Sequence, residues 1–328
     1  MLTIDDIRFL HIELTTRCNA RCPMCMRNFK GYPHNFGYPL ADLSLRDIKQ
    51  ILSKKFLQQI TYINFNGNLG DFSNAKDAIA IVNYVIENSQ ANIQIETNGS
   101  TNTAEWWKQL AHPRIDIYFA LDGLEDTHNL YRLDTNWNKV LENAKAVIRA
   151  GGNAIWKFIK FDHNKHQISD CEHMSKSLGF KSFEIVDQGR SQGPVYTRKG
   201  EISHWIGDPF INKLTINQDL DQHHKWFNNT DFNWLDQTCN ISCRHKNKKE
   251  IYIAADGSVY PCCWTGFYPT TMFLPGNSQI KDLVVRNNAL HYTLNECISW
   301  FNLLEKQWEL PDIASGKPFL CLQNCSKK

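Results

Sequence analysis

Short apolar runs alternate with segments of helical periodicity from the N-terminus to about residue 190. Six of these runs have the length and the β-branched and aromatic content that are typical of strands. The six runs span residues 7–14, 61–66, 92–98, 115–122, 154–161 and 182–187. Strict alternation of strand and helix predicts parallel strands that are joined by right-handed crossovers.

Local signals place the ends of several predicted helices. Ser44 is suited to cap a helix that has Asp47 in its first turn, and Gly179 is suited to end a later helix in a left-handed conformation. Six strand–helix units are too few for the closed eight-stranded barrel, so we expect an α/β fold with an open or partial barrel. Functional side chains in such barrels lie at the carboxyl ends of the strands.

Composition and charge narrow the class of protein. The chain has 328 residues and a formal net charge of +2, and no long basic stretch indicates a nucleic-acid partner. No apolar run approaches the roughly 20 residues of a membrane span, and no leader peptide follows Met1, so we expect a cytoplasmic protein. In a chain of this kind, eleven cysteines indicate metal binding or catalysis rather than disulfides.

Three cysteines stand close together directly after the first predicted strand. Cys18, Cys22 and Cys25 have the spacing C-x₃-C-x₂-C. Three thiols on one loop suit a [4Fe–4S] cluster that keeps one iron free of protein ligands. The alternative is a structural zinc site, which needs four ligands. The motif resembles that of the radical S-adenosylmethionine (radical SAM) superfamily, although Met24 takes the place of the aromatic residue usual in that family.

The resemblance implies a (β/α)₆ partial barrel over roughly the first 190 residues, and it implies a reaction. The free iron would chelate SAM, and an electron from the reduced cluster would cleave SAM to a 5′-deoxyadenosyl radical that abstracts hydrogen from a substrate. The electron would come from a donor such as flavodoxin or ferredoxin.

The same resemblance implies a set of SAM-binding residues at the ends of the next three strands. The loop FNGNLGDFS is similar to the family's Gly-Gly-Glu-Pro region, ETNGS to its TNG segment, and ALDGLEDTHNLYR to its Ser-x-Asp-Gly stretch with Ala120 at the serine position. Lys157 and Lys160 on the fifth strand are charges of the kind common at barrel rims, and no role is assigned to them. The implied SAM-binding residues are Gly67, Gly70, Asp71, Thr97, Asn98, Asp122 and Arg132.

Seven of the eleven cysteines fall in the last ninety residues. The runs EIYIA and SVYPC alternate around Asp256-Gly257, a dipeptide favoured in two-residue hairpin turns, so a hairpin would bring Cys243 and Cys262 to one side. Cys321 and Cys325 add two more thiols, and two helical segments lie between the hairpin and these thiols.

This tail resembles the auxiliary-cluster extensions of radical SAM enzymes known as SPASM and twitch domains. The shorter twitch form implies one auxiliary [4Fe–4S] cluster held by Cys243, Cys262, Cys321 and Cys325. Cys239 and Cys263 are close enough to replace two of these ligands, and a Cys₄ zinc site is the alternative. The chain is therefore expected to have a barrel over 1–190, a bridging segment over 191–238 with a solvated pair at His223 and His224, and an auxiliary-cluster domain over 239–328.

The leading interpretation is a radical SAM enzyme that oxidises or cross-links a peptide or protein with the help of the auxiliary cluster. A dehydrogenase of a small sugar or aminocyclitol is the alternative within the family. An iron–sulfur or zinc protein without catalytic activity is the alternative from another class, and an RNA-modifying enzyme is disfavoured by the modest charge.

Overall fold

The computed structural model describes residues 2–34, 38–187, 193–207, 217–221, 235–267 and 278–326. Most of the predicted bridging segment, including His223 and His224, lies outside the described residues. None of the helices within these ranges is both long enough and apolar enough to span a bilayer.

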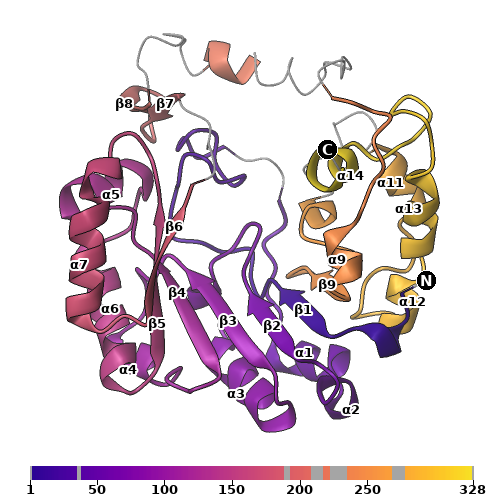
Figure 1. Ribbon diagram of the computed structural model, residues 1–328, viewed down its shortest axis with the longest axis horizontal. Coiled ribbons are helices and arrows are strands. Elements are labelled where there is room, and N and C mark those ends of the chain that lie inside the picture. The colour runs from indigo at the N-terminus through magenta and orange to yellow at the C-terminus, as the bar shows by residue number, and fades with distance from the viewer. Residues whose placement is uncertain are drawn as a thin grey trace.

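Six parallel strands follow one another in chain order and form the wall of a partial barrel (Figure 1). Each strand pairs in parallel with the next, as Phe9 with Tyr62 and Ile155 with Ser182. The strands are β1 (Phe9–Ile12), β2 (Tyr62–Phe65), β3 (Asn92–Thr97), β4 (Ile115–Ala120), β5 (Asn153–Ile159) and β6 (Ser182–Val186). The predicted α/β partial (β/α)₆ TIM-like barrel is confirmed, and all six predicted strands are present.

The helices of the barrel pack on the outer face of this sheet and bury its apolar side (Figure 1). They are α1 (Leu45–Ile51), α2 (Lys54–Leu57), α3 (Ala78–Asn88), α4 (Ala104–Lys108), α5 (Glu125–Tyr131), α6 (Trp137–Arg149) and α7 (Ile168–Leu178). Ser44 caps α1, because its hydroxyl accepts a hydrogen bond from the backbone N–H of Asp47. Gly179 ends α7 with φ of 84°, as its position in the sequence predicts.

The C-terminal hairpin extends the barrel sheet. Strand β9 (Glu250–Ile253) pairs in parallel with β1, and β10 (Val259–Tyr260) pairs with β9 in the antiparallel sense, so the sheet has eight strands in the order β10-β9-β1-β2-β3-β4-β5-β6. The turn differs from the predicted two-residue type. The backbone N–H of Ala254 bonds to Ser258 O, which leaves a three-residue loop with Gly257 at φ of 85°.

The remaining described elements flank the two ends of this sheet. A second hairpin lies within the predicted bridging segment and consists of β7 (Gly193–Tyr196) and β8 (Ile202–Ile206). Short helices complete the tail on the β9 side of the barrel (Figure 1). They are α9 (Arg244–Asn247), α11 (Ser278–Leu283), α12 (Leu294–Ile298), α13 (Phe301–Gln307) and α14 (Phe319–Cys325).

Candidate functional site

The three clustered cysteines lie in the loop after β1, at the carboxyl end of the barrel strands. Successive turns fold this loop on itself, since Cys25 N bonds to Cys22 O and Asn28 N bonds to Cys25 O. Burial raises the pKa of all three thiols, that of Cys25 to about 11, and the neighbouring thiols raise the pKa values of Cys18 and Cys25 further. The three sulfur atoms therefore lie within electrostatic reach of one another.

An apolar layer surrounds these thiols. The buried members of this layer are Ala20, Cys22, Tyr131, Ile159, Phe161, Val195 and Ile206, from the cysteine loop, the ends of α5 and β5, and both strands of the β7–β8 hairpin. The hairpin is anchored to the loop by the bond from Tyr196 N to Lys30 O, and to the end of α5 by His204 Nε2 against Leu130 O. It therefore packs against the cysteine loop and limits water access, which strengthens electrostatic interactions there.

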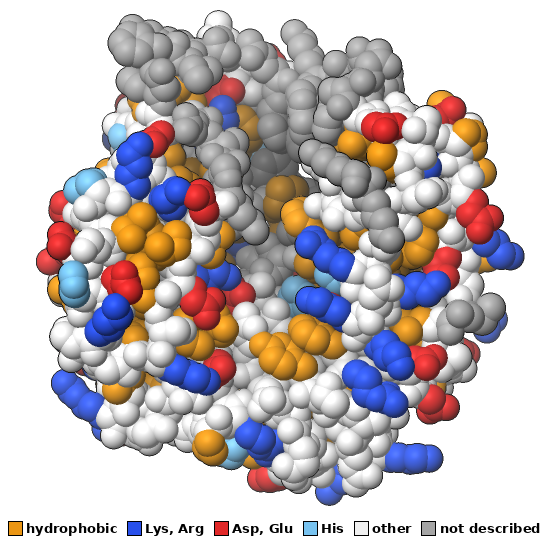
Figure 2. Space-filling model, in the orientation of Figure 1, with side chains coloured by type: hydrophobic (Ala, Val, Ile, Leu, Met, Phe, Trp, Pro, Cys, Tyr) orange, Lys and Arg blue, Asp and Glu red, His pale blue; other side chains and the backbone are white. Residues whose placement is uncertain are grey.

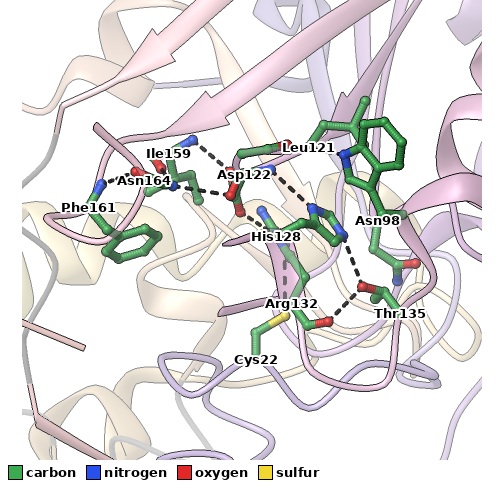
Figure 3. Close-up of polar contacts among 12 residues, drawn as sticks. Cys22, Asn98, Leu121, Asp122, His128, Arg132, Thr135, Ile159, Phe161 and Asn164 are labelled. Atoms are coloured by element: carbon green, nitrogen blue, oxygen red, sulfur yellow. Dashed lines mark hydrogen bonds and ion pairs between the residues drawn. The ribbon is translucent and has the colours of Figure 1, made fainter. Parts of the chain in front are cut away.

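Arg132 connects the cysteine loop to the end of β4 (Figure 3). Its Nε donates to Asp122 Oδ2 at 2.6 Å, and its Nη1 lies 3.8 Å from Cys22 Sγ. Asp122 is fully buried, and its other oxygen accepts the backbone N–H of Ile159 at 2.6 Å. Both carboxylate oxygens are thus engaged within the protein, so Asp122 holds Arg132 in place, and the implied ribose contact of Asp122 stays a prediction.

His128 supports the Asp122–Arg132 pair through the backbone of Asp122. Its Nδ1 accepts the backbone N–H of Asp122 at 3.2 Å, and its Nε2 lies 3.0 Å from Thr135 Oγ1 (Figure 3). Burial lowers the pKa of His128 to about 4, so the imidazole is neutral at pH 7. The neutral form is required because Nδ1 must accept a hydrogen bond there.

Asp71 ties the loop after β2 to the end of β3. Its carboxylate accepts Thr97 Oγ1 at 2.8 Å and the backbone N–H of Asn98 at 2.6 Å. Asn98 in turn directs its amide Nδ2 to Cys18 Sγ at 3.7 Å and to Asn19 Oδ1 at 3.0 Å. Three of the implied SAM-binding residues therefore form one buried assembly beside Cys18.

Gly67 and Gly70 allow the chain to approach its own backbone. A Cβ on Gly70 would lie 1.7 Å from Thr15 O, and one on Gly67 would lie 2.4 Å from Gly70 O. Beneath this loop, Glu13 accepts the backbone N–H groups of Leu69 and Gly70 at 2.6 and 2.8 Å. Sequence reasoning missed Glu13, although a carboxylate inside an apolar strand is an unusual feature that could have drawn attention to it.

The face of the sheet that points into the barrel is polar. Lys157 Nζ lies 2.5 Å from Glu96 Oε2, although β4 separates their strands. The contact crosses β4 diagonally, because Lys157 pairs with Ala120 whereas Glu96 pairs with Tyr118, two residues earlier on β4. Glu184 pairs in register with Lys157 on the other side. Figure 2 shows that the visible face of the molecule is hollowed between the barrel strands and the C-terminal elements, with charged side chains around the hollow.

In the tail, the four predicted cysteines line one cavity. Cys243, Cys262, Cys321 and Cys325 border it together with Trp308 and residues of α14. The Cys243 thiol hydrogen-bonds to the Cys325 sulfur, which lowers the pKa of Cys325, whereas burial raises the pKa of Cys262 and Cys321.

The surroundings of the cavity distinguish its four cysteines from Cys239 and Cys263. The indole N–H of Trp308 has no oxygen or nitrogen acceptor in the described part of the chain, and it faces the Cys321 sulfur. Cys239 bonds instead to Asp236, and Cys263 lies outside the cavity, near Glu250 and Arg244.

The described geometry is not that of a mononuclear zinc site. Over the described ranges, no three side chains of His, Cys, Asp or Glu are placed to hold one metal ion. Zinc needs its donors about 2.0–2.3 Å from one point. A four-iron cluster takes one thiolate per iron, so its ligands surround a larger body. The three thiols on the loop after β1 and the four thiols around the tail cavity fit such clusters better.

The fold and the cysteine loop together define an α/β partial-barrel protein with a three-thiol site at the strand ends. Residues 12–161 match the radical SAM superfamily model. The chain therefore has a radical SAM domain over residues 12–161, which indicates an enzyme, and its tail resembles the twitch and SPASM extensions of radical SAM enzymes.

Known proteins of similar sequence and structure agree with this placement. The chain is 23% identical over 279 residues to the cysteine-type anaerobic sulfatase-maturating enzyme of Clostridium novyi (strain NT), covering 76% of this chain and 71% of that one. It superimposes on Streptococcus suis SuiB bound to S-adenosylmethionine with a TM-score of 0.53 and 15% identity, over 79% of this chain and 60% of SuiB. It superimposes on anSMEcpe bound to AdoMet and the Cp18Cys peptide with a TM-score of 0.52 and 14% identity, over 97% and 88% of the two chains.

Proposed function

We propose that this enzyme cleaves SAM reductively and uses the resulting radical to oxidise or cross-link a peptide or protein. One observation carries the proposal: three thiols with C-x₃-C-x₂-C spacing share one loop, where Asn98 after β3 contacts Cys18 and Arg132 at the end of α5 contacts Cys22. Cys18, Cys22 and Cys25 would hold a [4Fe–4S] cluster. When bound, that group supplies the electron that splits SAM into methionine and the 5′-deoxyadenosyl radical.

The residues of the chain bind and orient the cofactor. The loop that contains Gly67 and Gly70 and the assembly of Asp71, Thr97 and Asn98 border the site for SAM. In Arg132, Nε is directed to Asp122 and Nη1 to Cys22. The remaining nitrogen, Nη2, would donate to the SAM carboxylate. The β7–β8 hairpin excludes water from the opposite side of the loop.

The tail would hold an auxiliary [4Fe–4S] cluster on Cys243, Cys262, Cys321 and Cys325. Four thiolates leave no open iron, which suits electron transfer rather than substrate chelation. Abstraction of a hydrogen atom leaves a substrate radical, and formation of a double bond or a cross-link requires the loss of one more electron and a proton. The auxiliary cluster would accept that electron, and flavodoxin or ferredoxin would supply the electron for SAM cleavage.

The polar interior of the barrel supports a polar substrate, since Lys157 and Glu184 pair in register there and Lys157 also bonds to Glu96. A peptide is favoured because SuiB is known bound to its precursor peptide SuiA, and this chain covers 76% of SuiB in that complex with a TM-score of 0.54 at 13% identity. We therefore place a peptide ahead of a sugar or aminocyclitol.

The decisive experiment measures 5′-deoxyadenosine from the anaerobically reconstituted full-length enzyme with dithionite and SAM. We expect the wild type to form it and the Cys18→Ala/Cys22→Ala/Cys25→Ala variant to form none. The matched control is Cys171→Ala/Cys297→Ala, which changes two buried thiols that belong neither to the apolar layer around the cysteine loop nor to the lining of the tail cavity. Cleavage that persists in the triple variant contradicts the proposal. Deuterium transfer from labelled peptides or aminocyclitols into 5′-deoxyadenosine then distinguishes the two substrate classes.

A further inference from the structure

We infer that Arg132 and Asn98 set the reduction potential of the SAM-cleaving cluster by directing N–H groups, and in Arg132 also a positive charge, at two of its thiolate ligands. This inference rests on the proposed function and goes beyond it, since it assigns these residues a role that is exercised before SAM binds.

Neighbouring residues orient the guanidinium of Arg132 toward the sulfur of Cys22. Its side chain is only 14% exposed, and its Nη1 lies 3.8 Å from Cys22 Sγ. Asp122 fixes the guanidinium through Nε at 2.6 Å, and Asp122 is itself fixed by Ile159 N and by the neutral ring of His128 (Figure 3). A chain of buried hydrogen bonds from three elements thus orients one N–H toward the sulfur.

Asn98 makes the corresponding contact on Cys18. Its Oδ1 accepts the backbone N–H of Ser100 at 3.0 Å, which identifies the other amide atom as nitrogen. That Nδ2 lies 3.7 Å from Cys18 Sγ. Asp71 holds the Asn98 backbone through its N–H, so the orientation of the side chain is also supported by its neighbours.

Physical chemistry predicts the sign of the effect. Reduction adds one negative charge to a cluster that thiolates already make negative. Hydrogen bonds to the sulfurs and a nearby positive charge stabilise the reduced form more than the oxidised form. The apolar layer around Cys22 keeps water away, so these interactions are weakly screened. Removing either donor should therefore lower the reduction potential.

The test is a redox titration of the full-length, anaerobically reconstituted enzyme, followed by electron paramagnetic resonance without SAM. The signal of the SAM-cleaving cluster is identified by its change when SAM is added afterwards. We expect Arg132→Met to shift the midpoint potential to more negative values, with a smaller shift for Arg132→Lys, which keeps the charge. Asn98→Asp keeps the acceptor for Ser100 N and replaces the donor to Cys18, so it should shift the potential in the same direction.

Arg17→Met is the matched control. Arg17 is next to Cys18 in sequence and carries the same charge, but its Nε bonds to Asp42 at 2.8 Å and its side chain is 50% exposed. A shift in Arg132→Met no larger than that in Arg17→Met overturns the inference. If Arg132→Met loses iron, Arg132→Lys and Asn98→Asp provide the test, and unchanged potentials in the variants that retain iron overturn it. A wild-type enzyme that binds no cluster contradicts the proposed function instead.

Discussion

Tyr252 and Glu13 are 239 residues apart and are joined by a hydrogen bond of 2.7 Å from the phenol to the buried carboxylate. Glu13 also holds the Gly70 loop, whereas Tyr252 belongs to β9, which leads toward Cys262 in the tail. Asn68 in the same loop donates to the backbone oxygen of Cys263 at 2.8 Å. The loop proposed to bind SAM and the tail proposed to hold the auxiliary cluster are therefore parts of one connected structure.

Tyr252→Phe should lower the free energy of unfolding by about 1–3 kcal/mol, because a buried carboxylate loses one of its three donors. Chemical denaturation of the full-length protein measures this change. Tyr292→Phe is the matched control, since Tyr292 is 42% exposed and its replacement should change stability by less than about 0.5 kcal/mol. Equal effects of the two substitutions would show that the Glu13 contact contributes nothing.

Gly70→Ala should destabilise the protein by about 3 kcal/mol, near the upper range for an overpacked core, because its Cβ meets the backbone oxygen of Thr15 at 1.7 Å. Gly151→Ala is the comparison. Gly151 has φ of 80° but nothing within 4 Å of an added Cβ, so only backbone strain of about 1–2 kcal/mol applies. Thermal unfolding compares the two variants, and a larger loss for Gly151→Ala contradicts the explanation.

His128 should make stability depend on pH between about 6.5 and 4. Burial lowers the pKa of the folded form to about 4, whereas the unfolded chain binds the proton near 6.5. The stability that His128 contributes is thus complete above about pH 6.5 and is lost as the pH falls toward 4. The difference in unfolding free energy between wild type and His128→Gln should shrink by about 2–3 kcal/mol from pH 7 to 4.5. A difference that stays constant with pH contradicts this account.

Cys321→Ala/Cys325→Ala should reduce the iron content from about eight to about four per chain, because each cluster holds four irons. Cys239→Ala/Cys263→Ala is the matched control and should keep about eight, since neither thiol lines the tail cavity. Iron and sulfide analysis of anaerobically reconstituted protein measures both. If only the control variant loses four irons, Cys239 and Cys263 are the ligands in place of Cys321 and Cys325.

Lys157→Met should lower substrate-dependent formation of 5′-deoxyadenosine about tenfold relative to substrate-free cleavage, which corresponds to about 1.4 kcal/mol of lost transition-state binding. The reason is that the Lys157–Glu96 pair faces the barrel interior at 2.5 Å. Lys181→Met removes a comparable pair with Asp116, in which the lysine side chain is 51% exposed, and should leave that ratio unchanged. The labelled substrate found by deuterium transfer is the probe, and equal effects of the two variants would exclude a specific role for Lys157.

Local patterns in the sequence were enough to predict the six parallel strands, the Ser44 cap, the Gly179 helix end and the three-thiol loop. Strand periodicity and cysteine spacing are properties of neighbouring residues, so they can be read without knowing the fold. They also indicated the four tail cysteines, which the structure brings to one cavity.

Contacts between distant segments were decided only by the tertiary structure. The sequence did not predict that β9 joins β1, that the β7–β8 hairpin covers the cysteine loop, or that Lys157 reaches Glu96 across β4. The family resemblance implies SAM contacts for Asp71 and Asp122, which stay predictions, but the sequence did not predict that their carboxylates also hold Asn98 and Arg132. A buried carboxylate must find donors wherever the packing supplies them, and that packing depends on strands and loops far apart in the sequence.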